Sequence, residues 1–142
     1  MAEQDLIRIA RGVVDAFNAS DWDRSRAALT PTSVYNELGT QRSIKGPNEI
    51  IEAFQSWKEA MPDVKGTIEN CVASGTTVTM EVIWNGTQTG PLTGPTGTIM
   101  ASGKSQTTPA AWVFDFDGEK IKESRHYFDM VTLLTQIGAM PQ

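Results

Sequence analysis

Two strand-like runs joined by Asp117-Gly118 constrain this chain more than any other feature. Asp-Gly between such runs is the strongest short-range signal for a β-hairpin, because a type I′ turn needs positive φ at both central residues. One run is 112–116 and the other is 119–128. The pair therefore predicts a tight antiparallel hairpin, and the helices and remaining strands have to be arranged around it.

A short helix is predicted directly after this hairpin. Asp129 can cap it, because its carboxylate can accept hydrogen bonds from the free N–H groups of the first turn. Phe128 and Leu133 have the spacing of a hydrophobic staple. Gly138 suits the left-handed conformation in which helices end. The stretch 112–138 thus reads as strand, turn, strand and docking helix, and it contains the only histidine, His126.

Three amphipathic helices are predicted in the N-terminal half. Residues 3–19 carry apolar side chains at helical spacing. Ser20 or Asp21 caps a second, shorter helix that ends before Pro31. A third helix opens at Gly46-Pro47, since proline suits the first helical position, and it ends at Pro62. The segments 32–38 and 41–45 are short strand candidates.

The chain changes to strand character after residue 62. Strands are predicted at 64–74 and 76–87, and the segment 90–105, rich in Gly, Pro and Thr, predicts a long loop at the rim of a site. We expect an α+β fold, in which the three N-terminal helices pack on the concave side of a cone-shaped, curved antiparallel sheet. Residues 1–142 are expected to form a single domain, and the wide end of the cone would form a pocket.

Composition excludes several classes of function. The 142 residues carry a net charge of −5 without a run of Lys or Arg, so nucleic acid and anionic membranes are not expected as partners. The single cysteine, Cys71, cannot form an intramolecular disulfide, which fits a reducing compartment. The sequence begins without the apolar core of a signal peptide and holds no apolar run of about 20 residues. We therefore expect a cytoplasmic protein.

Familiar catalytic and metal-binding motifs do not fit. Gly103-Lys104-Ser105 lacks the preceding glycine at the spacing of a phosphate-binding loop. The Asp115–Gly118 segment lacks the remaining ligand positions of a calcium loop. One histidine and one cysteine make a zinc site unfavourable, so no metal site is expected. No nucleophile-elbow motif provides a serine for His126.

Four segments together resemble the SnoaL-like polyketide cyclases, a family with the nuclear transport factor 2-like fold. They span nearly the whole chain, in the order and spacing of that family. The segments are Ala16-Phe17-Asn18; Phe54 and Trp57 before Met61-Pro62-Asp63; Asn85 to Leu92; and Asp117 to Ile121 through Tyr127-Phe128-Asp129 to Gly138.

The resemblance implies a cone-shaped barrel with a ligand cavity, no cofactor and a homodimeric assembly. It also implies ring closure by intramolecular aldol condensation, with a carboxylate near the end of the last strand as acid and base. That position falls on His126 here, and the family's auxiliary histidine falls on Ala111. The related limonene epoxide hydrolases need an Arg-x-Asp pair at positions that hold Val82 and Trp84, so their mechanism is not expected.

The candidate catalytic residues are His126 and Asp129. Imidazole titrates near neutrality and can take a proton from a carbon acid beside a carbonyl, although a lone strand histidine is commonly structural. For Asp129 the role of helix cap is the simpler interpretation. Aromatic and polar side chains are expected to bind a flat apolar, aromatic or polyketide-like ligand. These ligand-binding candidates are Asn36, Phe54, Trp57, Val82, Trp84, Gln88 and Trp112.

Two classes of function stay open at this point. The first is a cofactor-independent enzyme, either a polyketide (ester) cyclase or an isomerase like ketosteroid isomerase, with His126 as base and Asn36 or Gln88 polarising a carbonyl. The second is a non-catalytic protein that binds small molecules on the same fold, since the acid of the family pattern is absent. A histidine that opens into the cavity beside a second polar group would favour the enzyme.

Overall fold

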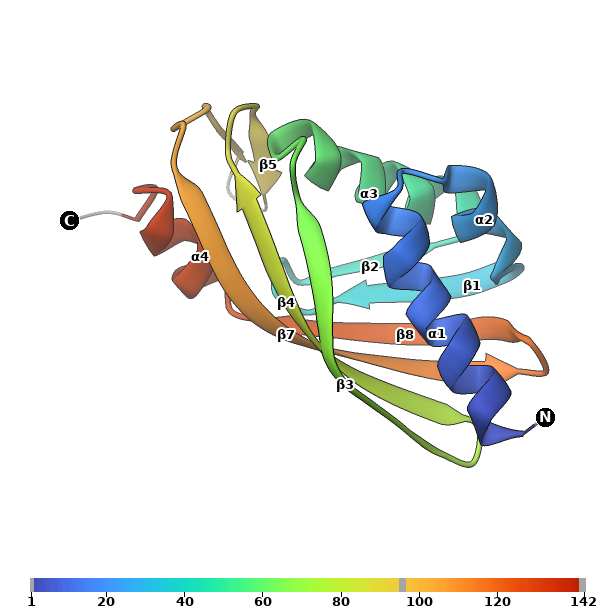
Figure 1. Ribbon diagram of the computed structural model, residues 1–142. Helices are drawn as coiled ribbons and strands as arrows, with labels where there is room; N and C mark the ends of the chain where they lie inside the picture. Colours follow the sequence, from blue (N-terminus) through green and yellow to red (C-terminus); the bar gives the residue numbers. More distant parts are fainter. Residues whose placement is uncertain (1, 95–96, 141–142) are drawn as a thin grey trace.

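The computed structural model describes residues 2–94 and 97–140 (Figure 1). Helices and strands follow the predicted order, with helices first and a run of strands after them. The elements are α1 (Glu3–Asn18), α2 (Trp22–Ala27), β1 (Leu29–Glu37), β2 (Arg42–Lys45), α3 (Pro47–Ala60), β3 (Lys65–Ser74), β4 (Thr77–Thr87), β5 (Leu92–Gly94), β6 (Gly97–Ile99), β7 (Ser105–Asp117), β8 (Lys120–Phe128) and α4 (Met130–Gln136).

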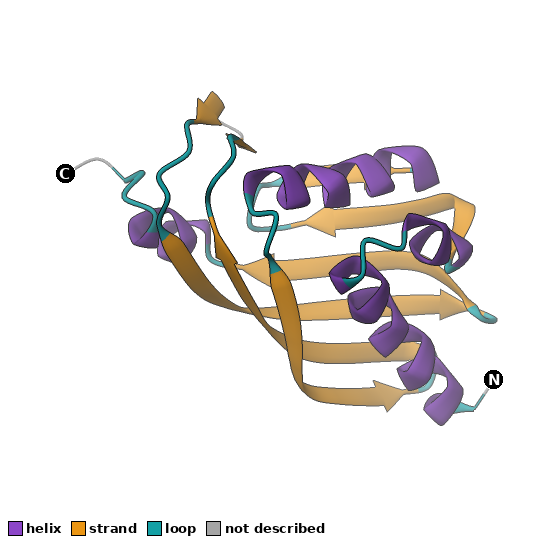
Figure 2. Ribbon diagram, turned by 45° about the horizontal axis from the view of Figure 1, so that its top comes forward, coloured by secondary structure: helices purple, strands orange, loops and turns teal. Residues whose placement is uncertain are grey.

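The main sheet has the strand order β2-β1-β8-β7-β4-β3 and is strongly curved (Figures 1 and 2). The α+β class and the position of the N-terminal helices over one face of the sheet are confirmed. The prediction of an antiparallel sheet is wrong in one place, because β1 runs parallel to β8, with Tyr35 opposite Ser124 and Glu37 opposite His126. Strand patterns in a sequence do not fix the direction of a pair whose members are about 90 residues apart.

The hairpin of β7 and β8 is present, but its turn lies one residue later than predicted. Asp117 pairs with Lys120, so the two loop residues are Gly118 and Glu119. Gly118 has φ +60° and the other loop residue has no positive φ. Glycine at the first loop position is the pattern of a type II′ turn, which suits the twist of a hairpin as well as type I′ does.

Strand β7 contributes a continuous row of buried residues to the inner face of the sheet. Its buried residues alternate without interruption: Gln106, Thr108, Ala110, Trp112, Phe114 and Phe116. Pro109 does not break this strand, because pairing with β8 begins only at Ala110, and the missing N–H therefore costs no bond in that ladder. The even-numbered residues of β7 therefore point inward.

The helices cover the concave face through their apolar stripes. Leu6, Ala10, Val13 and Phe17 of α1 are buried, as the helical spacing predicted. Helix α4 packs against β7 at the other end of the sheet and closes that end (Figure 1). The apolar stripe of each helix packs against the inner face of the sheet, and together they form one core that contains several large aromatic side chains.

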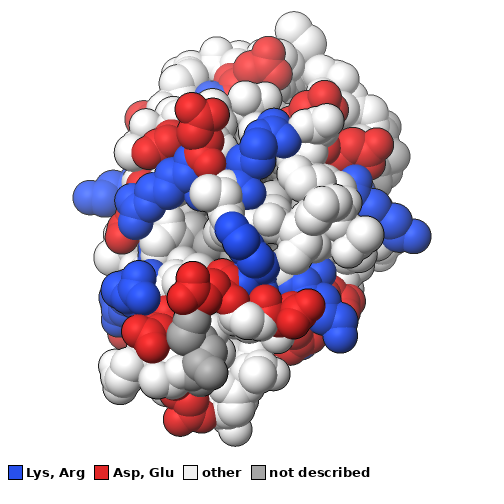
Figure 3. All heavy atoms as spheres, turned by 90° about the vertical axis from the view of Figure 1, so that its right-hand side faces the viewer, with Lys and Arg blue, Asp and Glu red and all other residues white. Residues whose placement is uncertain are grey.

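The segment 90–105 is not a loop throughout. Leu92–Gly94 and Gly97–Ile99 form the small antiparallel pair β5 and β6. In the part of the chain that the structure describes, no helix is long and apolar enough to cross a bilayer. On the face shown in Figure 3, Lys and Arg side chains are interspersed with Asp and Glu side chains.

Candidate functional site

An apolar cavity lies between the concave face of the sheet and the helices. Its volume is about 50 Å³, counted as space for the centres of water molecules. A single water needs roughly 10–15 Å³ by that measure, so the cavity has room for roughly four waters. The lining residues come from α1, α3 and α4, from four strands of the main sheet and from the α3–β3 connection. None of them is Asp, Glu, Lys or Arg. They are Phe17, Tyr35, Phe54, Trp57, Met61, Val64, Trp84, Gln106, Thr108, Trp112, His126, Phe128 and Leu133.

His126 is part of the cavity wall and is almost completely buried. It lies opposite Trp112 in the β7–β8 register, and the two rings stack with their centres 4.3 Å apart and their planes 8° from parallel. Burial lowers the pKa of His126 from its usual 6.5 to about 4, although the nearby charge of Glu37 acts in the opposite direction. The imidazole is therefore neutral at physiological pH.

The hydrogen bonds of His126 determine which ring nitrogen carries the proton. Trp84 Nε1 lies 3.2 Å from His126 Nε2, and an indole nitrogen can only donate, so Nε2 accepts and has no proton. The proton of the neutral ring is then on Nδ1, which lies 2.9 Å from the hydroxyl oxygen of Tyr35. The Tyr35 hydroxyl oxygen accepts a hydrogen bond from His126 Nδ1–H, and the hydroxyl hydrogen is donated to Glu37 Oε2 at 2.8 Å.

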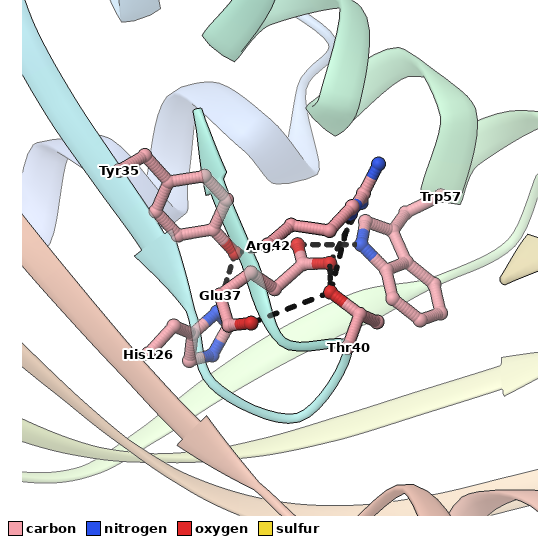
Figure 4. A network of polar contacts seen from close by, with 6 residues as sticks. All are labelled: Tyr35, Glu37, Thr40, Arg42, Trp57 and His126. Atoms are coloured by element: carbon pink, nitrogen blue, oxygen red, sulfur yellow. Dashed lines mark hydrogen bonds and ion pairs between the residues drawn. The ribbon is translucent and has the colours of Figure 1, made fainter. Parts of the chain in front are cut away.

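Glu37 ends this chain of hydrogen bonds with all its acceptor capacity in use (Figure 4). Its side chain is completely buried. Oε2 also accepts from Trp57 Nε1 at 3.0 Å, while Oε1 accepts from Thr40 at 2.6 Å and from Arg42 at 2.7 Å. Burial would raise the pKa of Glu37, but the hydrogen bonds from Thr40 and Arg42, the charge of Arg42 and the bond from Trp57 keep it below its usual value.

Glu37 is thus a buried carboxylate anion that is paired with Arg42. The Arg42 side chain is 39% exposed, so the pair joins the interior of the protein to solvent. Tyr35 stays protonated, because burial, followed by the neighbouring charge of Glu37, raises its pKa well above the usual value of 10. The resulting order is fixed by chemistry: Trp84 donates to His126, His126 to Tyr35 and Tyr35 to Glu37.

Comparison with protein-family models now decides the family. Residues 7–137 match the model of the SnoaL-like polyketide cyclases. The chain belongs to the SnoaL-like polyketide cyclase family. No curated protein matches this sequence.

Solved structures agree with the family on the fold. A proposed SnoaL-like polyketide cyclase of Jannaschia sp. CCS1 is 22% identical with a TM-score of 0.87, over 98% of this chain and 95% of that one. TsrD of Streptomyces laurentii is 19% identical with a TM-score of 0.84, over 99% of both chains. IdmH of Streptomyces antibioticus, a proposed polyketide cyclase, is 21% identical with a TM-score of 0.79, over 92% of this chain and 96% of that one. At these identities the likeness establishes the fold alone.

Five of the nine residues predicted for the site lie together in the cavity of this SnoaL-like chain. They are Phe54, Trp57, Trp84, Trp112 and His126. Among the residues that the structure describes, Trp112 Nε1 is a buried polar side-chain atom without a hydrogen-bond partner. Since an unpaired buried donor is costly, this indole is a candidate contact for a ligand oxygen.

Four predicted site residues lie elsewhere. Asn36 is on the opposite side of β1 from Tyr35 and donates to Glu123 Oε1 at 2.9 Å. Val82 is buried in the core but does not line the cavity. Gln88 donates to the carbonyls of Gly90, Ile99 and Met100 and accepts from the N–H of Ser102, so it stabilises the segment 90–102. Asp129 caps α4 by accepting from Val131 N at 2.9 Å and from the Thr132 hydroxyl.

Two further expectations about the site change. None of the described residues of the segment 90–105 lines the cavity, so the rim predicted there is not found among them; residues 95 and 96 lie outside the described residues. Ala111, to which the resemblance assigned the auxiliary histidine, pairs with Tyr127 on the outer face. The inward neighbours are Ala110 and Trp112, which follows from the uninterrupted alternation of β7.

Patterns in the sequence did not predict Tyr35, Glu37, Gln106 or Thr108 as site residues. Glu37 had no clear signal, because it alternates with Ser33 and Tyr35 on the more polar face of β1, and the burial of all three is visible only in the structure. A carboxylate buried in this way has to be paired. Within residues 2–94 and 97–140, no three His, Cys, Asp or Glu side chains are grouped so that they could hold a metal ion.

Proposed function

We propose that this SnoaL-like chain is a cofactor-independent enzyme that moves a proton at a carbon next to a carbonyl group. Its substrate is a small apolar or aromatic, polyketide-like molecule, and the reaction is an aldol-type ring closure or a related proton transfer. The observation that carries the proposal is a neutral imidazole in the wall of an apolar cavity, next to other polar groups. His126 contacts both Tyr35 and Trp84 there.

In this mechanism His126 Nε2 is the base. The C–H electron pair of the substrate becomes the enolate, and the proton moves to Nε2, so the ring becomes an imidazolium. Nδ1–H keeps its hydrogen bond to Tyr35, which is held by the Glu37 anion, and this favours the positive charge on the ring. After the enolate has attacked the second carbonyl, Nε2–H returns the proton to the new alkoxide, and the imidazole is neutral again.

Trp84 has to give up its contact with Nε2 when a substrate reacts. Breaking one neutral hydrogen bond costs about 0.5–1.5 kcal/mol, which binding of the ligand can offset. Tyr35 and Glu37 then serve as positioning residues, because they keep the ring proton on Nδ1 and leave Nε2 as the basic nitrogen. A neutral imidazole with a low pKa is a weak base, so the substrate should have an acidic C–H, such as one flanked by two carbonyl groups.

A non-catalytic binding protein is the second candidate. One specific observation favours it: both imidazole nitrogens already have partners within the protein. In that case the series of hydrogen bonds from Trp84 to Glu37 satisfies buried polar groups and gives the cavity a fixed shape. An isomerase would use the same base and differ only in where the proton is returned.

A homodimer formed through the outer face of the sheet is part of the proposal. Val113, Thr79 and Ile83 lie on this face, and the neighbouring Val72 and Tyr127 are 53% and 45% exposed. Exposed apolar side chains that lie together on a sheet are typical of an interface. No cofactor is required by the chemistry proposed.

Proton abstraction can be measured without the natural substrate. Ethyl benzoylacetate is a neutral aromatic ketoester with acidic methylene protons, and ¹H NMR in D₂O follows their replacement by deuterium. We expect the protein to accelerate this exchange above the buffer rate, and His126→Ala to lose about 100- to 10,000-fold of the acceleration. His126→Asp should keep part of it.

The control for this assay is Asp129→Asn. Asparagine caps a helix about as well as aspartate, so this variant should exchange the probe like the wild type. If His126→Ala binds the probe and exchanges it at the wild-type rate, His126 is not the base. If the wild type binds the probe without any acceleration, the binding protein is the better description.

A further inference from the structure

A second polar group, the side chain of Gln106 on β7, faces the same cavity as His126. Gln106 lines the cavity and is 2% exposed. Its oxygen Oε1 accepts from the Thr108 hydroxyl at 2.6 Å. Its nitrogen Nε2 has a single partner among the described residues, the sulfur of Met61 at 3.5 Å. A thioether is a weak acceptor, and an amide nitrogen has two hydrogens to donate.

The orientation of this amide follows from its hydrogen bond to Thr108. The two hydrogens of Gln136 Nε2 are donated to the carbonyls of Thr107 and Thr132 at 3.0 Å, so Gln136 does not occupy the Thr108 hydroxyl. The Thr108 hydroxyl donates to Gln106 Oε1 at 2.6 Å. Gln106 therefore presents its N–H₂ end, rather than its carbonyl oxygen, on the Met61 side.

From this geometry we infer that Gln106 forms a subsite for an uncharged carbonyl oxygen of the ligand. A buried donor without a good acceptor is costly, and a carbonyl oxygen would remove that cost. The ligand would be neutral because the cavity lining includes no Lys or Arg to pair with a carboxylate and no Asp or Glu to pair with an amine. This inference rests on the proposed function, in that it assumes that the cavity binds a small molecule.

The position of Gln106 shows what this subsite would do. Gln106 precedes Trp112 by six residues on β7, and Trp112 is the register partner of His126. Gln106 bonds to Thr108, the register partner of Trp84, and Trp84 donates to His126, so the amide and the base face one small cavity. Gln106 thus holds a ligand carbonyl at the Met61 side of this cavity. It selects a ligand with an oxygen at that side and sets its orientation.

Matched small probes test this subsite in the intact protein. Acetophenone carries the carbonyl, α-methylstyrene replaces the C=O by C=CH₂ at nearly the same shape, and benzoate adds a negative charge. Dissociation constants come from NMR titration of wild type and of Gln106→Met, which removes the donor and keeps the side-chain length. One hydrogen bond of about 0.5–1.5 kcal/mol corresponds to an about 2- to 12-fold weaker binding of acetophenone by the variant.

The expected pattern is specific to the carbonyl. α-Methylstyrene should bind both proteins with similar affinity, and benzoate should bind wild type far more weakly than acetophenone does. Should Gln106→Met not fold, the wild-type spectrum decides: the side-chain N–H₂ signals of Gln106 should shift with acetophenone and not with α-methylstyrene. Equal shifts with both probes would overturn the subsite.

Other outcomes separate this subsite from the proposed function. If Gln106→Met weakens the binding of acetophenone and of α-methylstyrene equally, the amide is only part of the cavity wall. Ligand binding then stands without the subsite. If wild type binds no probe, the subsite and the ligand cavity both fall. A failure of the exchange assay with His126→Ala concerns the base alone and leaves the Gln106 subsite unaffected.

Discussion

The low pKa of His126 links the stability of this protein to pH. The pKa of His126 is about 4 in the folded protein and 6.5 in the unfolded chain. As the pH falls, the unfolded chain therefore binds a proton at this histidine before the folded protein does. The unfolded state then gains stability as the pH falls below 6.5, so the free energy of unfolding falls with it. This contribution is complete above pH 6.5 and is lost progressively toward pH 4.

The size of the effect follows from the two pKa values. Between pH 7.5 and pH 5.0 the linkage lowers the free energy of unfolding by about 2 kcal/mol, since each unit of pKa difference corresponds to about 1.4 kcal/mol. Glu37 has a lowered pKa, so its contribution is present above the unfolded value near 4.5 and is lost only as the pH falls below it. A comparison that stops at pH 5.0 therefore reports mainly on the histidine.

Urea unfolding followed by tryptophan fluorescence at both pH values measures this difference. His126→Gln is the matched variant, because its side chain is polar, does not titrate and leaves every carboxylate of the protein in place. We expect wild type to lose about 2 kcal/mol more than the variant between pH 7.5 and 5.0. Equal losses in the two proteins would refute the assignment of His126 as a buried, neutral imidazole.

Three further predictions concern the site and the assembly. Tyr35→Phe leaves His126 Nδ1–H without its acceptor and Glu37 without one donor, so denaturant unfolding should show a loss of about 1–3 kcal/mol. Gly39→Ala would place a methyl group against the Phe128 ring, which lines the cavity, so acetophenone should bind at least several-fold more weakly in the NMR titration while the spectrum stays that of a folded protein. Light scattering at micromolar concentration should give the mass of a dimer, and Val113→Asp should shift it toward the monomer; a monomeric wild type would contradict the proposed interface.

Local patterns in the sequence were sufficient for most of the fold. The apolar stripe of α1, the Pro47 start of α3 and the strand–turn–strand–helix unit up to Gly138 are all present in the structure. These features depend on residues close together in sequence, for which propensity and capping rules are strong. The parallel pairing of β1 with β8 was missed because it depends on long-range packing, which local patterns do not encode.

The site was predicted only in part for a related reason. Aromatic residues on inward faces were found, and His126 was selected because it is the single histidine and because the family resemblance assigned it the catalytic position. Asn36 and Gln88 were chosen for polarity, but their side chains satisfy local partners, one across β1–β8 and one in the segment 90–102. Glu37 was missed because its partners Thr40, Arg42 and Trp57 are brought together only by the turn after β1 and by α3.

The protonation of the single imidazole is the most direct test of the proposed base. A protein without a histidine tag, labelled with ¹⁵N-histidine, gives the signals of His126 alone. We expect an unprotonated Nε2 and a protonated Nδ1 from pH 7.5 to 5.0, with the Nε2 signal moving when ethyl benzoylacetate is added. A proton on Nε2, or an imidazolium that forms near pH 6.5, would contradict the proposed base and the hydrogen-bond chain that positions it.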